Sequence, residues 1–159
     1  MRKPSVSVIG SSSATAKELA WAEEVGRLLA RSGIVLVCGG LGGVMEAACR
    51  GAKSAGGLTV GILPMADRDA GNTYLDVAIP TGIGYAWNCI VAYSGDAVIA
   101  IGGSSGTLSE IAYATIRGVP VVTLGSWRLE ERELSDGASL VPVRTAAEAV
   151  EKVLAWIGR

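Results

Sequence analysis

Three turns rich in glycine and hydroxyl side chains are the parts of this sequence best suited to chemistry. Each follows a short apolar run and precedes a segment of helical periodicity: Gly10-Ser11-Ser12-Ser13, Gly39-Gly40-Leu41-Gly42-Gly43 and Gly102-Gly103-Ser104-Ser105-Gly106-Thr107. The amino end of a helix offers unpaired N–H groups, glycine lets the backbone approach an anion, and Ser and Thr add hydroxyl donors. The turns therefore predict cradles for a phosphate group, although a single turn of this kind can also serve only to pack a helix on a sheet.

The same turns exclude two familiar nucleotide-binding motifs. None is a Walker A sequence, because the lysine is missing, and the first apolar run is followed by Gly-Ser-Ser-Ser rather than by the dinucleotide fingerprint. The chain has no histidine, which excludes a Ser-His-Asp triad, a Cys-His pair and a His-ligated zinc site. Any reaction must therefore use carboxylates, hydroxyls, Arg, Lys, a thiol or backbone amides.

The cysteines and the charge balance narrow the class further. Cys38, Cys49 and Cys89 have no metal-like spacing and lie in or beside apolar segments, which predicts buried thiols in a reducing cytoplasm and no metal site. The formal net charge is -1 without a basic stripe, so a nucleic-acid partner is not expected. No apolar stretch approaches the roughly 20 residues of a membrane span, and the first residues lack the pattern of a signal peptide.

Short aliphatic runs alternate with amphipathic segments along the 159 residues and would position the three turns. The predicted strands are 5–9, 34–37, 59–63, 76–79, 97–101, 120–124 and 140–141, and the predicted helices are 15–31, 43–55, 85–93, 105–117 and 145–157. Residues 65–75 and 126–137 are expected to be exposed loops, the second with some helix. This order predicts an α/β fold: a three-layer, Rossmann-like, doubly wound and mainly parallel sheet in a single domain spanning 1–159. Ligands bind such sheets beyond the carboxyl ends of the strands, where all three turns fall.

Two of the turns also resemble the motifs of a known family. The segment 39–48 is similar to the first motif of the LOG-like Rossmann superfamily (SLOG type), often labelled lysine decarboxylases, and 102–110 resembles its second, P-G-G-x-G-T-x-x-E. Thr81-Gly82-Ile83-Gly84 and Asp96-Ala97-Val98-Ile99 also fit the family pattern. The resemblance runs from the first strand to Leu124. It is closest to the short branch that includes molybdenum cofactor carrier proteins.

The sequence also resembles an enzymatic branch of this superfamily, the phosphoribohydrolases, which cleave nucleoside 5'-monophosphates at the N-glycosidic bond. The resemblance implies that the second motif holds the phosphate, that Glu110 contacts the ribose region, and that an upstream arginine assists. Trp87 stands where that arginine is expected, while the neighbouring Asn88 is kept. Tryptophan supplies neither charge nor a bidentate donor, although it can stack on a flat ring.

Two functions therefore stay open. The first is a binding or carrier protein for a phosphorylated, nucleotide-like ligand, either a nucleotide monophosphate or the molybdenum cofactor. The second is a phosphoribohydrolase in which Glu110 is catalytic. The resemblance further implies a homodimer or homotetramer, and no membrane partner is expected. The candidate binding residues are Gly10, Ser11, Ser12, Gly39, Gly40, Gly42, Gly43, Thr81, Gly82, Trp87, Asn88, Gly102, Gly103, Ser104, Ser105, Gly106, Thr107 and Glu110.

Overall fold

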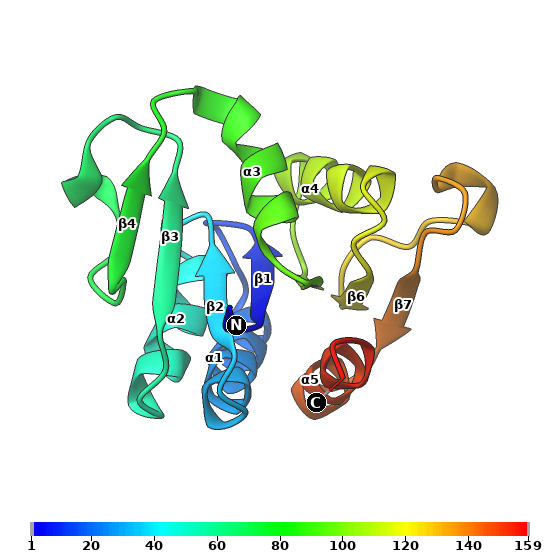
Figure 1. Ribbon diagram of the computed structural model, residues 1–159, viewed down its shortest axis with the longest axis horizontal. Helices are drawn as coiled ribbons and strands as arrows, with labels where there is room; N and C mark the ends of the chain where they lie inside the picture. Colours follow the sequence, from blue (N-terminus) through cyan, green and yellow to red (C-terminus); the bar gives the residue numbers. More distant parts are fainter. Residues whose placement is uncertain (1, 159) are drawn as a thin grey trace.

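The computed structural model describes residues 2–158, and these fold around one parallel sheet (Figure 1). The seven strands are β1 (Ser5–Gly10), β2 (Val35–Cys38), β3 (Thr59–Leu63), β4 (Val77–Pro80), β5 (Ala97–Ile101), β6 (Val121–Leu124) and β7 (Leu140–Val143). The α-helices are α1 (Ala16–Arg31), α2 (Val44–Ser54), α3 (Trp87–Ser94), α4 (Ser105–Ile116) and α5 (Ala146–Trp156). Short 3-10 turns η1 (Arg68–Ala70), η2 (Gly84–Ala86) and η3 (Glu131–Glu133) lie between them.

The strand order is β4-β3-β2-β1-β5-β6-β7, and every neighbouring pair is parallel. The chain builds outward from β1 to β4, then returns to the other side of β1 to add β5, β6 and β7. The topological switch point therefore lies between β1 and β5. Their register pairs Gly10 with Ile101, so the first and third glycine turns begin side by side. The predicted doubly wound α/β architecture is confirmed.

The helices form two layers because successive strand residues face opposite sides of the sheet. Val6 and Val8 of β1 join the core under α1, α2 and α5, whereas Ile9 joins the core under α3 and α4. In Figure 1, α3 and α4 accordingly lie on the opposite side of the sheet from α1, α2 and α5. The strands β1, β2, β5 and β6 are mostly buried and mostly aliphatic, as a sheet covered on both faces requires.

Helices α1 and α2 pack so closely that only glycine fits at two points of contact. A Cβ placed on Gly26 of α1 would collide with the carbonyl oxygen of Ala48, and one on Gly51 of α2 would collide with that of Glu23. The amino end of α2 lies against the turn that follows β1, where the Val44 N–H donates to the Ser11 carbonyl oxygen at 3.0 Å. In the described residues, the longest helix has 16 residues and none is both long and apolar enough to cross a membrane.

Candidate functional site

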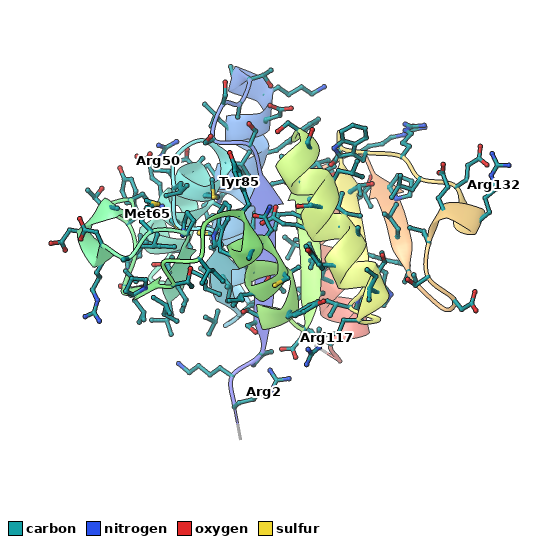
Figure 2. The ribbon with its side chains drawn as sticks, turned by 90° about the horizontal axis from the view of Figure 1, so that it is seen from above. Arg2, Arg50, Met65, Tyr85, Arg117 and Arg132 are labelled. Carbon is teal, nitrogen blue, oxygen red and sulfur yellow. The ribbon has the colours of Figure 1, made fainter. Side chains whose placement is uncertain are left out.

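A cavity of about 130 Å³ lies at the switch point, beyond the carboxyl ends of β1 and β5. It opens toward an outer hollow of about 770 Å³, with which it shares Ser12, Tyr85, Asn88, Ser104 and Gly106. Seen from above in Figure 2, Tyr85 lies over the middle of the molecule. The residues around the inner cavity are Gly10, Ser11, Ser12, Leu41, Met45, Tyr85, Trp87, Asn88, Ser104, Gly106, Thr107 and Glu110. One cavity thus brings together nine of the predicted site residues from three separate segments.

The turn after β5 forms the part of the wall best suited to an anion. Ser104 is the N-cap of α4, but its side chain caps none of the helix N–H groups. The first-turn amides of α4, which have no acceptor within the helix, therefore remain as donors beside the cavity. Gly103 adopts φ +100°, and a Cβ there would collide with Thr107, so this tight turn requires glycine. Gly102 is also left-handed (φ +54°), and its carbonyl oxygen accepts a hydrogen bond from Ser126 across the turn.

The turn after β1 was expected to offer free helix amides to a phosphate, but it does not. A capping box closes the amino end of α1: the Glu18 N–H donates to Thr15 Oγ1 at 3.2 Å, and the Thr15 N–H donates to the Glu18 carboxylate at 2.8 Å. These α1 amides are already used within the helix. The turn instead reaches the cavity through Gly10, Ser11 and Ser12.

The glycines after β2 allow close packing behind the residues that line the cavity. A Cβ on Gly39 would lie 2.8 Å from Met45 Sδ and 2.9 Å from a ring carbon of Trp87, while a Cβ on Gly40 would collide with Leu63. Gly43, at φ +60°, packs against the backbone of Ser11 and Ser12. The structure places these three glycines in packing contacts, whereas a Cβ on Gly42 would meet only the Glu46 carboxylate, at 3.9 Å.

Leu41 and Met45 are the residues by which this part of the chain reaches the cavity, and the sequence analysis missed both. The sequence feature that could have identified them is their position in and just after the glycine turn. Tyr85 also lines the cavity, and its position two residues before Trp87 is the corresponding feature. Thr81 and Gly82 lie farther along the sheet, where the Thr81 hydroxyl donates to the carbonyl oxygen of Leu63 at 2.6 Å. Ser105 lines the outer hollow.

Glu110 is a buried carboxyl on the cavity wall. It is only 6% exposed, and none of the hydrogen bonds among the described residues uses it. Burial without a counter-charge raises its pKa from 4.5 to about 8. At neutral pH the group is therefore a carboxylic acid, which has an O–H to donate and a carbonyl oxygen to accept.

Trp87 and Asn88 reach the cavity from the first turn of α3. Among the buried side-chain polar atoms that the structure describes, Trp87 Nε1 is the one without a hydrogen-bond partner. A buried N–H without an acceptor is costly, and such groups mark places where a ligand or water completes the bonding. Asn88 is 5% exposed, and its Nδ2 donates to Ser109 Oγ at 2.9 Å.

Positive charge is missing from the described wall of the cavity, where neither Lys nor Arg is present. Trp87 occupies the position at which the family resemblance implies an arginine. Arg117 and Arg132 lie toward the outside of the molecule (Figure 2). An anion in this cavity would be held by amides and hydroxyls rather than by an ion pair.

Two of the cysteines, Cys38 and Cys49, lie in the core under α1 and α2. Cys38 and Cys49 are buried, with their sulfur atoms 3.5 Å apart, and the Cys49 contact and burial raise the pKa of the Cys38 thiol. Both are thus the packed thiols that were predicted. Cys89 of α3 is half-buried, so the prediction of a buried thiol was wrong for it. Within the described chain, no three Cys, Asp or Glu side chains gather closely enough to hold a metal ion.

The buried Glu110 makes a testable contribution to the pH dependence of stability. Its pKa is higher in the folded chain (about 8) than in the unfolded chain (4.5), so the folded state binds more protons between these values. The free energy of unfolding should therefore fall as the pH rises from about 4.5 to about 8. Urea unfolding across this range should show the decline in the wild type and a flat profile in Glu110→Gln. Parallel profiles for the two proteins would contradict the assignment.

Comparison with known proteins identifies the family. The chain belongs to the SLOG cluster4 family, whose model matches residues 3–151, and this confirms the resemblance to the LOG-like superfamily. The structure of the molybdenum cofactor binding protein from Rippkaea orientalis is similar at 40% identity and a TM-score of 0.90, covering 99% of each chain. The molybdenum cofactor carrier protein of Chlamydomonas reinhardtii is 33% identical, with a TM-score of 0.86 over 99% of this chain and 100% of that one. An uncharacterized protein of Archaeoglobus fulgidus is 46% identical over 124 residues, which are 78% of this chain and 82% of the relative.

Proposed function

We propose that this protein binds and carries a phosphorylated, nucleotide-like small molecule, and that its ligand is the molybdenum cofactor. The observation that carries the proposal is the cavity at the switch point, where an uncapped helix end meets Trp87, whose buried Nε1 has no hydrogen-bond partner among the described residues. Relatives of the same fold and nearly the same length, named for binding or carrying this cofactor, support the choice of ligand.

The wall of the cavity has two chemically different ends. The amides of the first turn of α4, with the hydroxyls of Ser104, Thr107 and Ser11, suit the oxygens of a phosphate. Trp87, Met45 and Leu41 offer an apolar surface for a flat ring such as a pterin. The inner volume of about 130 Å³ accepts one part of such a molecule, and the outer hollow of about 770 Å³ has room for the rest.

The same geometry favours holding the ligand over breaking it. Hydrolysis of an N-glycosidic bond needs charged groups that stabilise the developing charge, and Trp87 replaces the expected arginine. Glu110 has no hydrogen-bond partner among the described residues that would orient it or take its proton. Its burial and its place in the family motif keep phosphoribohydrolysis as the second candidate, with Glu110 as its acid or base.

The exposed apolar side chains of η2, α3 and α4 support assembly of the chain with copies of itself. Tyr85 is 89% exposed and Ile116 66%, and Ile90, Tyr113 and Ile83, which directly precedes η2, are also exposed. Tyr85 and Tyr113 additionally border the outer hollow. A second copy packed on this face would cover the apolar side chains and close the hollow, as in a homodimer or homotetramer.

Titration calorimetry tests the proposal. We expect the purified protein to bind the molybdenum cofactor or its metal-free pterin monophosphate, and to bind the dephosphorylated pterin at least about tenfold more weakly. Incubation with AMP, followed by chromatography for free adenine, addresses the second candidate in the same preparation. Failure of every phosphorylated compound to bind at millimolar concentration would sink the carrier function, whereas adenine release that Glu110→Ala abolishes would establish the hydrolase.

A further inference from the structure

Ser109 lies between the turn proposed to bind the phosphate and Glu110, at a position that the family motif leaves unspecified. Its hydroxyl donates to the carbonyl oxygen of Gly106 at 2.6 Å and accepts from Asn88 Nδ2 at 2.9 Å. These two bonds link the first turn of α4 to the first turn of α3. Ser109 borders the outer hollow, and Asn88 borders both the hollow and the inner cavity.

The proton count at Ser109 fixes the orientation of the Asn88 carboxamide. A serine hydroxyl has one proton, and here that proton goes to the Gly106 carbonyl oxygen. Ser109 Oγ can then only accept from Asn88, so the NH₂ group of the carboxamide must face Ser109. Asn88 Oδ1 is thereby turned away from Ser109, and none of the hydrogen bonds among the described residues uses it.

An oriented carbonyl oxygen at this point selects for a hydrogen-bond donor. Phosphate oxygens at neutral pH are acceptors almost throughout, so Asn88 Oδ1 repels them and leaves them to the α4 amides. Asn88 Nδ2 lies close to that cradle, 3.9 Å from where a Cβ on Gly106 would be. The donor must therefore belong to the part of the ligand that follows the phosphate.

We propose that Ser109 is a positioning residue, which holds Asn88 so that its Oδ1 accepts a hydrogen bond from an N–H or O–H group of the ligand next to its phosphate. The proposal rests on the proposed function. In this arrangement Asn88 contacts the body of the ligand, and the turn before α4 binds its phosphate. Two sources supply such a donor, a sugar hydroxyl and the N–H of a heterocycle.

The experiment compares the affinities of methyl phosphate, ribose 5-phosphate and AMP, measured by calorimetry on the full chain. In Ser109→Ala, we expect affinity for AMP to fall about five- to tenfold while methyl phosphate binds as in the wild type. A matching loss for ribose 5-phosphate assigns the donor to a hydroxyl, and a loss for AMP alone assigns it to the heterocycle. Ser109→Thr, which keeps the hydroxyl, should restore the wild-type preference.

A double-mutant cycle shows whether Ser109 acts through Asn88. Asn88→Leu keeps the volume and removes the acceptor, and adding Ser109→Ala to it should cause no further loss. Equal losses for all three probes, or additive losses in the double variant, would overturn the positioning role. Wild-type protein that binds none of the three, and no pterin monophosphate, would overturn the proposed function itself. Wild-type protein that binds all three with no preference would overturn this inference alone.

Discussion

Gly106→Asp should abolish ligand binding and leave the fold at least as stable as the wild type. Gly106 is in the first turn of α4, and a Cβ there would find its nearest neighbour, Asn88 Nδ2, at 3.9 Å, so the side chain fits. A carboxylate at the amino end of a helix interacts favourably with the helix dipole, which supports stability. The same carboxylate occupies the donors proposed for the phosphate and repels it. We expect affinity to fall at least about a hundredfold.

Two variants at the same position separate charge from shape. Gly106→Asn has nearly the same size as Asp but no charge, and we expect it to lose much less affinity. Gly106→Ala tests whether any side chain is tolerated, and it should bind like the wild type. Thermal unfolding and calorimetry on all three give stability and affinity side by side. Equal binding by Gly106→Asp and Gly106→Ala would show that no phosphate lies at this helix end.

Gly51→Ala should destabilise the fold strongly for so small a substitution. Its Cβ would collide with the carbonyl oxygen of Glu23, a backbone atom that cannot rotate away. Relief of the collision requires α1 and α2 to separate, and such overpacking costs about 1–3 kcal/mol or more. This cost exceeds the gain of about 1 kcal/mol from replacing a helical glycine by alanine. Gly26→Ala, which meets Ala48 from the other side of the contact, should behave alike.

The matched control is again Gly106→Ala, the same chemical change at a helical glycine with room for a Cβ. Denaturant unfolding should place Gly51→Ala and Gly26→Ala below the wild type in free energy of unfolding, and Gly106→Ala at or above it. If Gly51→Ala unfolded at the wild-type denaturant concentration, the close packing of α1 on α2 would be contradicted.

Much of the fold follows from the sequence because a parallel sheet buried on both faces leaves a plain pattern. The runs 59–63 and 97–101 coincide with β3 and β5, and the other strands and helices differ by one or two residues at their ends. The expected helix at 85–93 is divided into η2 and α3, and β7 extends to Val143 rather than ending at 141. Residues 126–137 contain only the short η3. Such ends depend on local hydrogen bonds, which a hydrophobic period does not encode.

The site was harder to predict than the fold because glycine has two uses. Gly39, Gly40 and Gly106 occur in similar glycine-rich turns, so the sequence pattern does not distinguish their roles. In the structure, Gly39 and Gly40 pack against Trp87, Met45 and Leu63. Of these three glycines, only Gly106 borders the cavity. The Thr15–Glu18 capping box uses amides at the amino end of α1 that the turn pattern alone predicts to be free. The burial that keeps Glu110 neutral arises from three segments meeting at the switch point, which no local pattern contains.

The most direct test of the carrier function is the molybdenum content of protein isolated from cells that make the cofactor. Wild-type protein purified gently and without metal chelators should carry molybdenum and pterin phosphate in equal amounts, approaching one of each per chain. Gly106→Asp, folded to the same degree, should carry neither. Wild-type protein with no molybdenum and no pterin, or a Gly106→Asp variant loaded as fully as the wild type, would contradict this account of the site.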